Sequence, residues 1–362
     1  MLPNSISVKG IDLHTNRFNV SHIKDEDGKE ERKTYDIPAD IPAFLNSLSC
    51  EDVIVVEASG NTFAFAHLIR NRVKKVHIVD PLDFRIIHDT RKKTDKIDAQ
   101  KLARGGVYHE CVDSNHLPLV TLPDKKIMEL RSLFATYRKI THRITAVTNR
   151  IHSILKGCLK PYNDRHIRSK DVRSEIEGLD IELAYKLQIK ILYDEMDLVL
   201  KHKALLAEVI LGYAKYYEED VKIMTSIPGI SILIALALKA DYIDISRFAN
   251  AKKFCSYLRT APKVDKSNKT THITCLNKHS RKLSLSLVIQ GLPHFYASNT
   301  YLSQYRKKKM QGKHAGRVRI AMARKMLNIL YVMLKRKELY RYSLPLVYAR
   351  KLEELEKLKK TA

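Results

Sequence analysis

The sequence has little of what marks zinc-binding, disulfide-rich or membrane proteins. Its five cysteines are scattered and none forms a CxxC pair, which argues against a zinc site and a disulfide framework. The longest apolar run, ISILIALAL, is far shorter than the roughly 20 residues that a membrane-spanning helix needs. The first residues, MLPNSISVKGID, show no basic segment followed by an apolar stretch, so we expect no signal peptide. These absences predict reduced thiols, no membrane partner and a cytoplasmic location.

Basic residues are in large excess. The 362 residues include 65 Lys and Arg against 40 Asp and Glu, which gives a formal net charge of +25. The hydrophobic fraction of 44% indicates a globular chain, and its length allows two or three domains. Solubility or a membrane surface would be alternative explanations of the charge. Because the excess is large and appears in many segments, a polyanion is the better prediction, and nucleic acid is the commonest one.

Residues 5–104 predict a mixed α/β sheet with an antiparallel start. The expected order is three strands, a helix, a strand, a helix, a strand and a helix. The corresponding stretches are SISVKGIDLHT, RFNVSHI, TYDI, IPAFLNSL, DVIVVEA, NTFAFAHLIRNR, KKVHIVD and DKIDAQKLAR.

The remainder of the chain predicts helices. Residues 124–157 carry apolar side chains at steps of three and four, and a second helix is expected over 178–217. These two helices form either an intramolecular hairpin or a dimerising coiled coil. We predict four parts: a catalytic α/β domain over 1–110, a helical coiled-coil or dimerisation region over 111–220, a mostly α domain over 221–345, and a charged tail over 346–362 that forms a frayed helix.

Four carboxylates stand out within the predicted α/β domain. Asp12 lies between Ile11 and Leu13 in the first strand, and Glu57 ends the apolar stretch VIVVE. Asp95 and Asp98 share one face of the last helix. Each alone has a plain explanation as a turn cap, a strand end or a partner of a nearby lysine. Together, in this topological order, they favour a shared site.

Clustered carboxylates repel one another, and a divalent cation relieves that repulsion. Oxygen ligands of this kind suit Mg²⁺ or Mn²⁺, so the predicted metal ligands are Asp12, Glu57, Asp95 and Asp98. Two such ions about 4 Å apart would hold the attacking and leaving oxygens of a phosphoryl transfer. The basic residues around Asp95 would then hold the polyanion whose phosphate meets the metal.

The order KGIDLHT, VVEASG, VDP and KKTDKIDAQKLA resembles the RuvC-like, RNase H-fold DEDD domain of the bacterial insertion-sequence transposase family numbered one hundred and ten. That family also includes the Piv-type DNA invertases. TDKIDA is the most specific piece, since the family shows Lys-Thr-Asp followed by Asp-Ala. The resemblance implies that the family's catalytic tetrad corresponds to Asp12, Glu57, Asp95 and Asp98.

The C-terminal region also resembles this family. MTSIPGISILIALALKA contains the Ile-Pro-Gly-Ile turn that opens the family's transposase domain, a helix-hairpin-helix-like start, and RFANAKKFCSYL follows it. The same tetrapeptide could be a plain loop before a buried helix. The resemblance implies that Ser267 is the nucleophile, although the family's Ser-Gly pair is Ser267-Asn268 here. Ser280, Ser284 and Ser286 are weaker candidates, and NKHSRKLSLS lacks a glycine of the family's pattern.

The resulting hypothesis is a bacterial or archaeal, nucleoid-associated DNA transposase or recombinase. It would cut and exchange strands through a covalent 5′-phosphoserine intermediate, within a homodimer or homotetramer. Its partners would be donor DNA, target DNA and, as the resemblance implies, a noncoding bridge RNA. A Piv-type invertase, a junction nuclease that uses water, and a non-catalytic nucleic-acid binder are alternatives. The residues predicted to contact nucleic acid are Lys92, Lys93, Lys96, Arg138, Arg143, Arg150, Gly229, Lys266, Lys269, Arg306, Lys307 and Lys308.

Overall fold

The computed structural model describes residues 6–24, 29–81, 83–84, 95–160, 167–261, 263–267, 270–274 and 283–360. The side chains of residues 29, 95–96, 263–267 and 270–274 lie outside this description. The chain divides into two compact units, Met1–Pro123 and Asp124–Ala362. Among the described residues, none of the helices combines the length and the apolar character needed to cross a bilayer.

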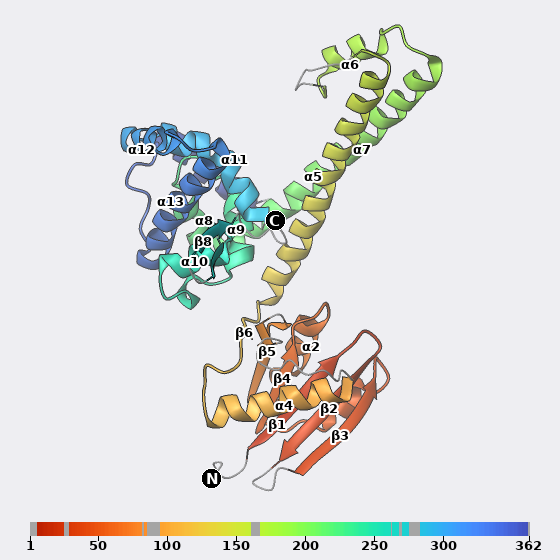
Figure 1. The fold of residues 1–362 in the computed structure, drawn as a ribbon, viewed down its shortest axis with the longest axis vertical. Coiled ribbons are helices and arrows are strands. Elements are labelled where there is room, and N and C mark those ends of the chain that lie inside the picture. The colour runs from red at the N-terminus through yellow and green to blue at the C-terminus, as the bar shows by residue number, and fades with distance from the viewer. Residues whose placement is uncertain are drawn as a thin grey trace. The chain divides into compact units, whose positions relative to one another are not determined.

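The first unit is built on a six-stranded mixed sheet with the strand order β3-β2-β1-β4-β5-β6 (Figure 1). β1, β2 and β3 are antiparallel neighbours, β4 and β5 run parallel to β1, and β6 is antiparallel to β5. The strands are β1 (Ser7–Leu13), β2 (Arg17–Lys24), β3 (Lys29–Asp36), β4 (Asp52–Glu57), β5 (Lys75–Val79) and β6 (Leu119–Val120). The helices are α1 (Ile41–Asn46), α2 (Thr62–Ile69) and α4 (Asp95–Cys111).

Helices cover both faces of this sheet. On one face, Ile11 of β1 and Ile54 of β4 pack with Phe44 of α1 and Phe65 of α2. On the other face, Val8 and Val55 pack with Leu102 of α4. Because side chains alternate along a strand, each central strand is apolar on both sides, as expected for strands buried between two layers of helices. The predicted order of strands and helices is confirmed.

The second unit begins with a long antiparallel helical hairpin. α5 (Lys125–Gly157) starts where the sequence predicts, because the Asp124 side chain accepts a hydrogen bond from the Ile127 N–H at 2.7 Å. α7 (Leu183–Gly212) returns along α5, and the short helix α6 (Lys170–Glu177) packs near the tip. The apolar stripe of α5, including Ile144 and Ile151, is buried within this hairpin and the helical body. Of the two sequence-based alternatives, the intramolecular hairpin is therefore the one that accounts for the apolar stripe of α5.

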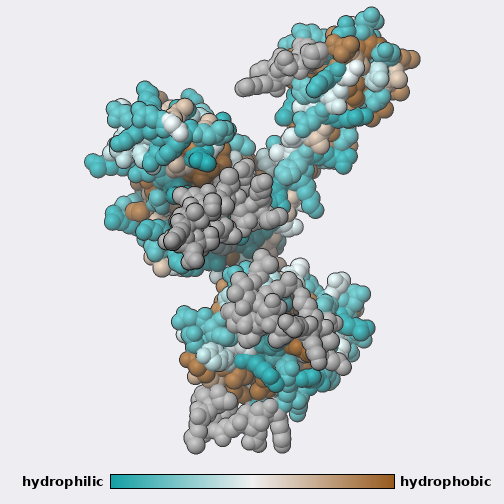
Figure 2. All heavy atoms as spheres, viewed as in Figure 1, coloured by the Kyte–Doolittle hydropathy of each residue, from teal (hydrophilic) through white to brown (hydrophobic). Residues whose placement is uncertain are grey.

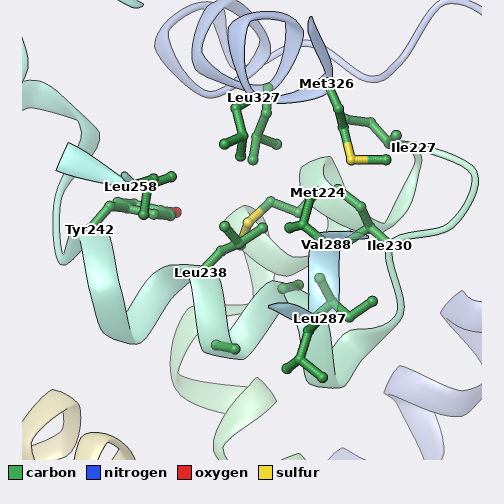
Figure 3. Packing of buried hydrophobic residues seen from close by; sticks show 14 of the residues in the cluster. Met224, Ile227, Ile230, Leu238, Tyr242, Leu258, Leu287, Val288, Met326 and Leu327 are labelled. Carbon is green, nitrogen blue, oxygen red and sulfur yellow. The ribbon is translucent and has the colours of Figure 1, made fainter. Parts of the chain in front are cut away.

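The helical body of the second unit follows the hairpin. Its helices are η1 (Tyr213–Tyr217), α8 (Glu218–Thr225), α9 (Ile232–Tyr242), η2 (Ile245–Arg247), α10 (Ala251–Tyr257), α11 (Leu283–Ala297), α12 (Thr300–Met310), α13 (Ala315–Arg336) and α14 (Pro345–Lys360). Figure 3 shows its core, where Met224 and Leu238 meet Val288 of α11 and Leu327 of α13. β7 (Lys263–Ser267) and β8 (Thr270–Thr274) form a two-stranded antiparallel hairpin.

Two regions differ from the sequence-based expectation. The sheet continues past residue 110, because β6 pairs with β5 and the first unit ends at Pro123. The tail is an ordered helix, α14, rather than a frayed one. Its Leu355 is buried in the core of the helical body, and its Lys351 donates hydrogen bonds to backbone carbonyls of the body.

Candidate active site

Asp12 lies on the α4 side of the central strand β1. Its neighbours Ile11 and Leu13 are buried on the opposite side of the sheet, as the sequence predicts. The Asp12 side chain is only 14% exposed, and its Oδ2 lies 3.1 Å from Nε2 of His14. A carboxylate therefore stands at the carboxyl end of a central strand, on the face that α4 covers.

Glu57 is the last residue of β4, beside the end of β1. The two strands are parallel, and their last register pair is Ile11 with Val56. Asp12 and Glu57 are the next residues of each strand, so they lie on the same face, across strands about 4.8 Å apart. The Thr62 hydroxyl donates to the Glu57 carbonyl at 2.6 Å and joins the end of β4 to the start of α2.

The packing of α4 shows which end of the helix meets these carboxylates. A Cβ on Gly10 would lie 2.2 Å from the Ala99 carbonyl oxygen, and a Cβ on Gly106 would lie 2.6 Å from the Val55 side chain and 2.8 Å from that of Val8. Ala99 thus lies over Gly10, and Gly106 lies over Val8, two residues earlier in β1. α4 therefore runs opposite to β1, and its amino end faces the carboxyl ends of β1 and β4.

Asp95 and Asp98 occupy this amino end of α4. Asp95 is the first helical residue, although its side chain lies outside the described residues. Asp98 is partly exposed, and its Oδ1 lies 3.2 Å from Nζ of Lys101. One turn of α4 is tied to the edge of the sheet, because the Gln100 side chain donates a hydrogen bond to Glu30. The backbone thus directs three of the four predicted positions, Asp12, Glu57 and Asp98, toward one end of the sheet.

The donor set fits a hard divalent cation. Carboxylate oxygens on two adjacent strands and on the helix that crosses them supply the ligand type that Mg²⁺ and Mn²⁺ prefer. The Asp12 carboxylate lies beside the His14 imidazole, and the Asp98 carboxylate lies beside the Lys101 ammonium. The residues present therefore suit a metal-dependent phosphoryl-transfer site.

Ser267 belongs to the second unit. It is the last residue of β7 and pairs in register with Thr270, and residues 268 and 269 lie outside the described residues. The alternative Ser284 is only 1% exposed on α11, and its hydroxyl donates to the Asp241 carboxylate. Burial and this hydrogen bond give Ser284 a structural role and argue against it as the nucleophile. Ser280 lies outside the described residues, and Ser286 is partly buried on α11.

The Ile-Pro-Gly-Ile turn is held inside the helical body. Ile227 and Ile230 are buried, and Gly229 has a φ of 92°. A Cβ on Gly229 would lie 2.1 Å from the Gly291 carbonyl oxygen of α11, and the reverse approach is equally close. This arrangement explains the glycine through close backbone packing, without a phosphate. It corresponds to the plainer of the two sequence-based interpretations.

Lys351 of α14 holds the same turn through hydrogen bonds. Its ammonium donates to the carbonyls of Thr225 and Ile230, each at 2.8 Å, and burial lowers its pKa to about 8. Sequence reasoning missed this residue, because a lysine in a charged tail carries no local signal of such a contact. Gly10 was also missed, although a glycine inside a predicted strand does signal close approach by another element.

The basic residues differ in what surrounds them. Arg143 is paired with Glu195, Nε to Oε1 at 2.7 Å, and the Arg306 guanidinium lies 4.5 Å from the centre of the Tyr296 ring. The exposed members of the predicted set are Arg138, Arg143, Arg150, Lys307 and Lys308. The members whose side chains lie outside the described residues are Lys92, Lys93, Lys96, Lys266 and Lys269.

A second group of potential ligands lies at the other end of α4. His77, His109 and Glu110 offer ligand atoms within 4.8 Å of one another. The Glu110 carboxylate, however, is within 2.7 Å of both Nζ of Lys75 and Nε2 of His77, and Nδ1 of His109 accepts a hydrogen bond from the Leu117 N–H at 3.3 Å. Since each member already has a protein partner, a hydrogen-bonded network accounts for the group.

Comparisons with known proteins match both units. A model of DEDD transposases, described as "Transposase", matches residues 9–160, and a second model, "Transposase IS116/IS110/IS902 family", matches residues 221–302. The "Transposase for insertion sequence element IS1111A" of Coxiella burnetii (strain RSA 493 / Nine Mile phase I) is 24% identical over 263 residues, which are 69% of this chain and 68% of that protein. The four predicted carboxylates fall within the first match, and Ser267 falls within the second.

Proposed function

Since the chain belongs to the IS116/IS110/IS902 family of transposases, we propose that it cuts and rejoins DNA through a metal-dependent site of Asp12, Glu57, Asp95 and Asp98, with Ser267 as nucleophile. The chain is a DNA transposase, and the proposal concerns how it works. The observation that supports it is the register of β1 with β4, together with the direction of α4, which directs carboxylates from three elements to one end of an RNase H-like sheet.

Each residue has a defined task in this proposal. The Ser267 oxygen attacks a DNA phosphorus, a bond from serine to phosphorus forms, and the bond from phosphorus to the 3′ oxygen breaks to release a 3′-hydroxyl. Attack by a 3′-hydroxyl of another strand then reverses these changes and frees the serine. The carboxylates would hold Mg²⁺ or Mn²⁺, which stabilises the charge on the attacking and leaving oxygens. Because the phosphodiester energy is kept in the covalent link, no nucleotide triphosphate is needed.

The first test detects the covalent link. Cognate DNA is incubated with protein and Mg²⁺ and resolved on a denaturing gel. We expect an adduct with the wild type and none with Ser267→Ala. An adduct that persists in Ser267→Ala contradicts the serine assignment. Cut ends without any adduct would instead favour the nuclease that uses water.

The second test concerns the carboxylates. Asp12→Asn keeps the side-chain shape but removes the charge, so we expect strand cleavage to be lost. Asp36→Asn is a matched control, because Asp36 is 63% exposed on the edge strand β3. A readout independent of activity is the melting temperature, which Mg²⁺ should raise in the wild type and in Asp36→Asn but not in Asp12→Asn. Equal responses of the two variants contradict the metal site.

We further propose that nucleic acid is held along exposed basic side chains, such as Arg138 and Arg150 of α5 and Lys307 and Lys308 of α12. Such side chains contact mainly phosphates. Replacing one of them by a neutral residue should therefore lower the salt dependence of the affinity for nucleic acid. Guidance by a noncoding bridge RNA rests on the family resemblance. It predicts that cleavage at the cognate site requires RNA transcribed from the DNA flanking the reading frame, and site-specific cleavage without that RNA would contradict it.

A further inference from the structure

A cavity lies between α11, α12 and α13 in the helical body. Its volume is about 320 Å³, at the lower end of the range typical of ligand pockets. Its apolar lining includes Leu292, Val318 and Met322, which are all buried. The cavity therefore has space and an apolar floor for one small molecule, or for one group of a larger one.

Polar and cationic side chains complete this lining. They are the Gln290 amide of α11, the Arg306 guanidinium of α12 and the Arg319 guanidinium of α13. None of the described residues that line the cavity is an Asp or a Glu, and the sequence of residues 266–337 contains neither. The two guanidinium groups therefore have no carboxylate in this segment to neutralise them.

An aromatic ring lies beside one of these cations. Tyr296, near the end of α11, lines the cavity, and the Arg306 guanidinium lies 4.5 Å from the centre of its ring. The backbone at Tyr296 is tied to α12, because the Ser303 hydroxyl donates a hydrogen bond to the Tyr296 carbonyl at 3.0 Å. An aromatic ring and a guanidinium both offer a planar surface on which a nucleobase can stack.

The chemistry of this lining matches a nucleobase. A base has two flat faces and an edge of hydrogen-bond donors and acceptors, and sites for unstacked bases combine stacking side chains with polar groups. Arginine and glutamine side chains both form hydrogen bonds with base edges. A wholly apolar ligand would leave the polar groups of the lining without partners, and a phosphate alone would make no use of the apolar floor.

The charge around the cavity favours a base that belongs to a nucleic-acid strand. Between residues 300 and 319 the chain carries seven Lys and Arg and no Asp or Glu, so phosphates on either side of the base would meet positive charge. Figure 2 shows mostly hydrophilic surface, in teal, at the end of the helical body where Figure 1 labels α12. DNA strands that exchange partners must unpair near the cut, so the reaction itself supplies an unpaired base.

We propose that the cavity between α11, α12 and α13 holds one unpaired base of the DNA, stacked on Tyr296 and the Arg306 guanidinium. A base held there cannot pair again with its former partner strand, which favours strand exchange. The inference rests on the strand exchange of the proposed function, because that step opens the duplex. It does not rest on Ser267 or the carboxylates, since holding a base needs neither a metal nor cleavage.

The first experiment measures the affinity of the intact protein for DNA without divalent metal, by fluorescence anisotropy. The two probes are a labelled single strand and the same strand with abasic nucleotides in place of its bases. Tyr296→Leu should weaken binding of the strand with bases by about tenfold, as expected for the loss of one stacking partner, and should leave the affinity for the abasic strand unchanged. Equal effects on the two strands, or no effect on either, overturn the proposal.

Tyr301→Leu is the matched control. Tyr301 is 59% exposed on α12 and has Nζ of Lys325 5.6 Å from its ring centre, but it is not among the residues that line the cavity. We expect this variant to bind both strands as the wild type does. Equal losses in Tyr301→Leu and Tyr296→Leu would assign the stacking to the exposed surface of α12 and overturn the cavity. A loss that Tyr296→Leu shows only with an RNA strand would overturn the choice of DNA.

The second experiment needs no variant of the cavity. A DNA strand that contains 5-iododeoxyuridine is bound and irradiated, and the cross-linked peptide is identified by mass spectrometry. We expect attachment at Tyr296, and attachment only to residues outside the lining overturns the proposal. The same cross-link should form in Ser267→Ala. If Ser267→Ala still forms the covalent DNA adduct while the cross-link at Tyr296 persists, the serine assignment fails and the base-binding cavity is supported.

Discussion

Gly10→Ala tests the contact that orients α4 over the carboxylates. The added Cβ would lie 2.2 Å from the Ala99 carbonyl oxygen and 2.3 Å from the Ala103 nitrogen, and both are backbone atoms that no rotamer change can move. Contacts of this kind are not seen below 3.0 Å, so α4 must rise by about 0.8 Å. Overpacking of this kind lowers the free energy of unfolding by about 1–3 kcal/mol. Replacing glycine by alanine also stabilises the fold, because it restricts the unfolded chain, but that gain is smaller.

The same displacement should reduce catalysis further. Asp98 precedes Ala99 in α4, so it moves with the helix away from Asp12. A misplacement of about 1 Å in a catalytic group can lower the rate by about 100-fold. We therefore expect strand cleavage by Gly10→Ala to fall by about that factor under conditions where the first unit remains folded, while affinity for DNA changes little.

Two other glycines serve as controls for this prediction. Gly60→Ala meets nothing within 4 Å and should stay within about 0.5 kcal/mol of the wild type. Gly106→Ala meets the side chains of Val55 and Val8, which can turn, so its effect should be intermediate. Hydrogen exchange of amides in β1 and α4 measures the stability of the first unit directly. If Gly10→Ala matches Gly60→Ala in both exchange and cleavage, the packing of α4 on Gly10 and the site built on it are wrong.

Three further predictions concern stability. Acidification from pH 6.5 downward should destabilise the first unit, because burial lowers the pKa of His109 in the folded state and the unfolded chain then takes up more protons. Glu110 should add to this loss of stability below pH 4.5, because the hydrogen bonds from its basic neighbours outweigh its burial and lower its pKa. Urea unfolding at several pH values measures the free energy of unfolding, and a value that does not change with pH contradicts the prediction. Lys351→Met should destabilise the second unit by about 2 kcal/mol, because it removes the charged donor from the turn carbonyls. Urea unfolding measures this change, and an unchanged midpoint would show that those hydrogen bonds make no net contribution to stability. Gly291→Ala should lower the melting temperature, because its Cβ would lie 2.0 Å from the Gly229 carbonyl oxygen, whereas Gly212→Ala meets nothing within 4 Å; equal melting temperatures would refute the close approach.

Local patterns predict most of the elements in this chain. The apolar run around VIVVE, the stripe of α5 and the Asp124 cap each depend on residues close in sequence, and each element forms as expected. The alternation at Ile11, Asp12 and Leu13 also predicts correctly which side chains enter the core, because successive strand residues point to opposite faces. The sequence, together with the family resemblance, predicts a site of four carboxylates, and that site stays a prediction.

Contacts between residues that are distant in the chain could not be predicted from local sequence patterns. Which end of α4 meets β1 depends on Gly10 lying under Ala99, and the role of α14 depends on Lys351 reaching the turn after α8. The stripe on α5 is indistinguishable in sequence from a dimer seam, and its burial by α7 leaves the other face of α7 exposed. Hydrophobic periodicity reports that a face will be covered, but the covering element is chosen by long-range packing, whose partners are not neighbours in the chain.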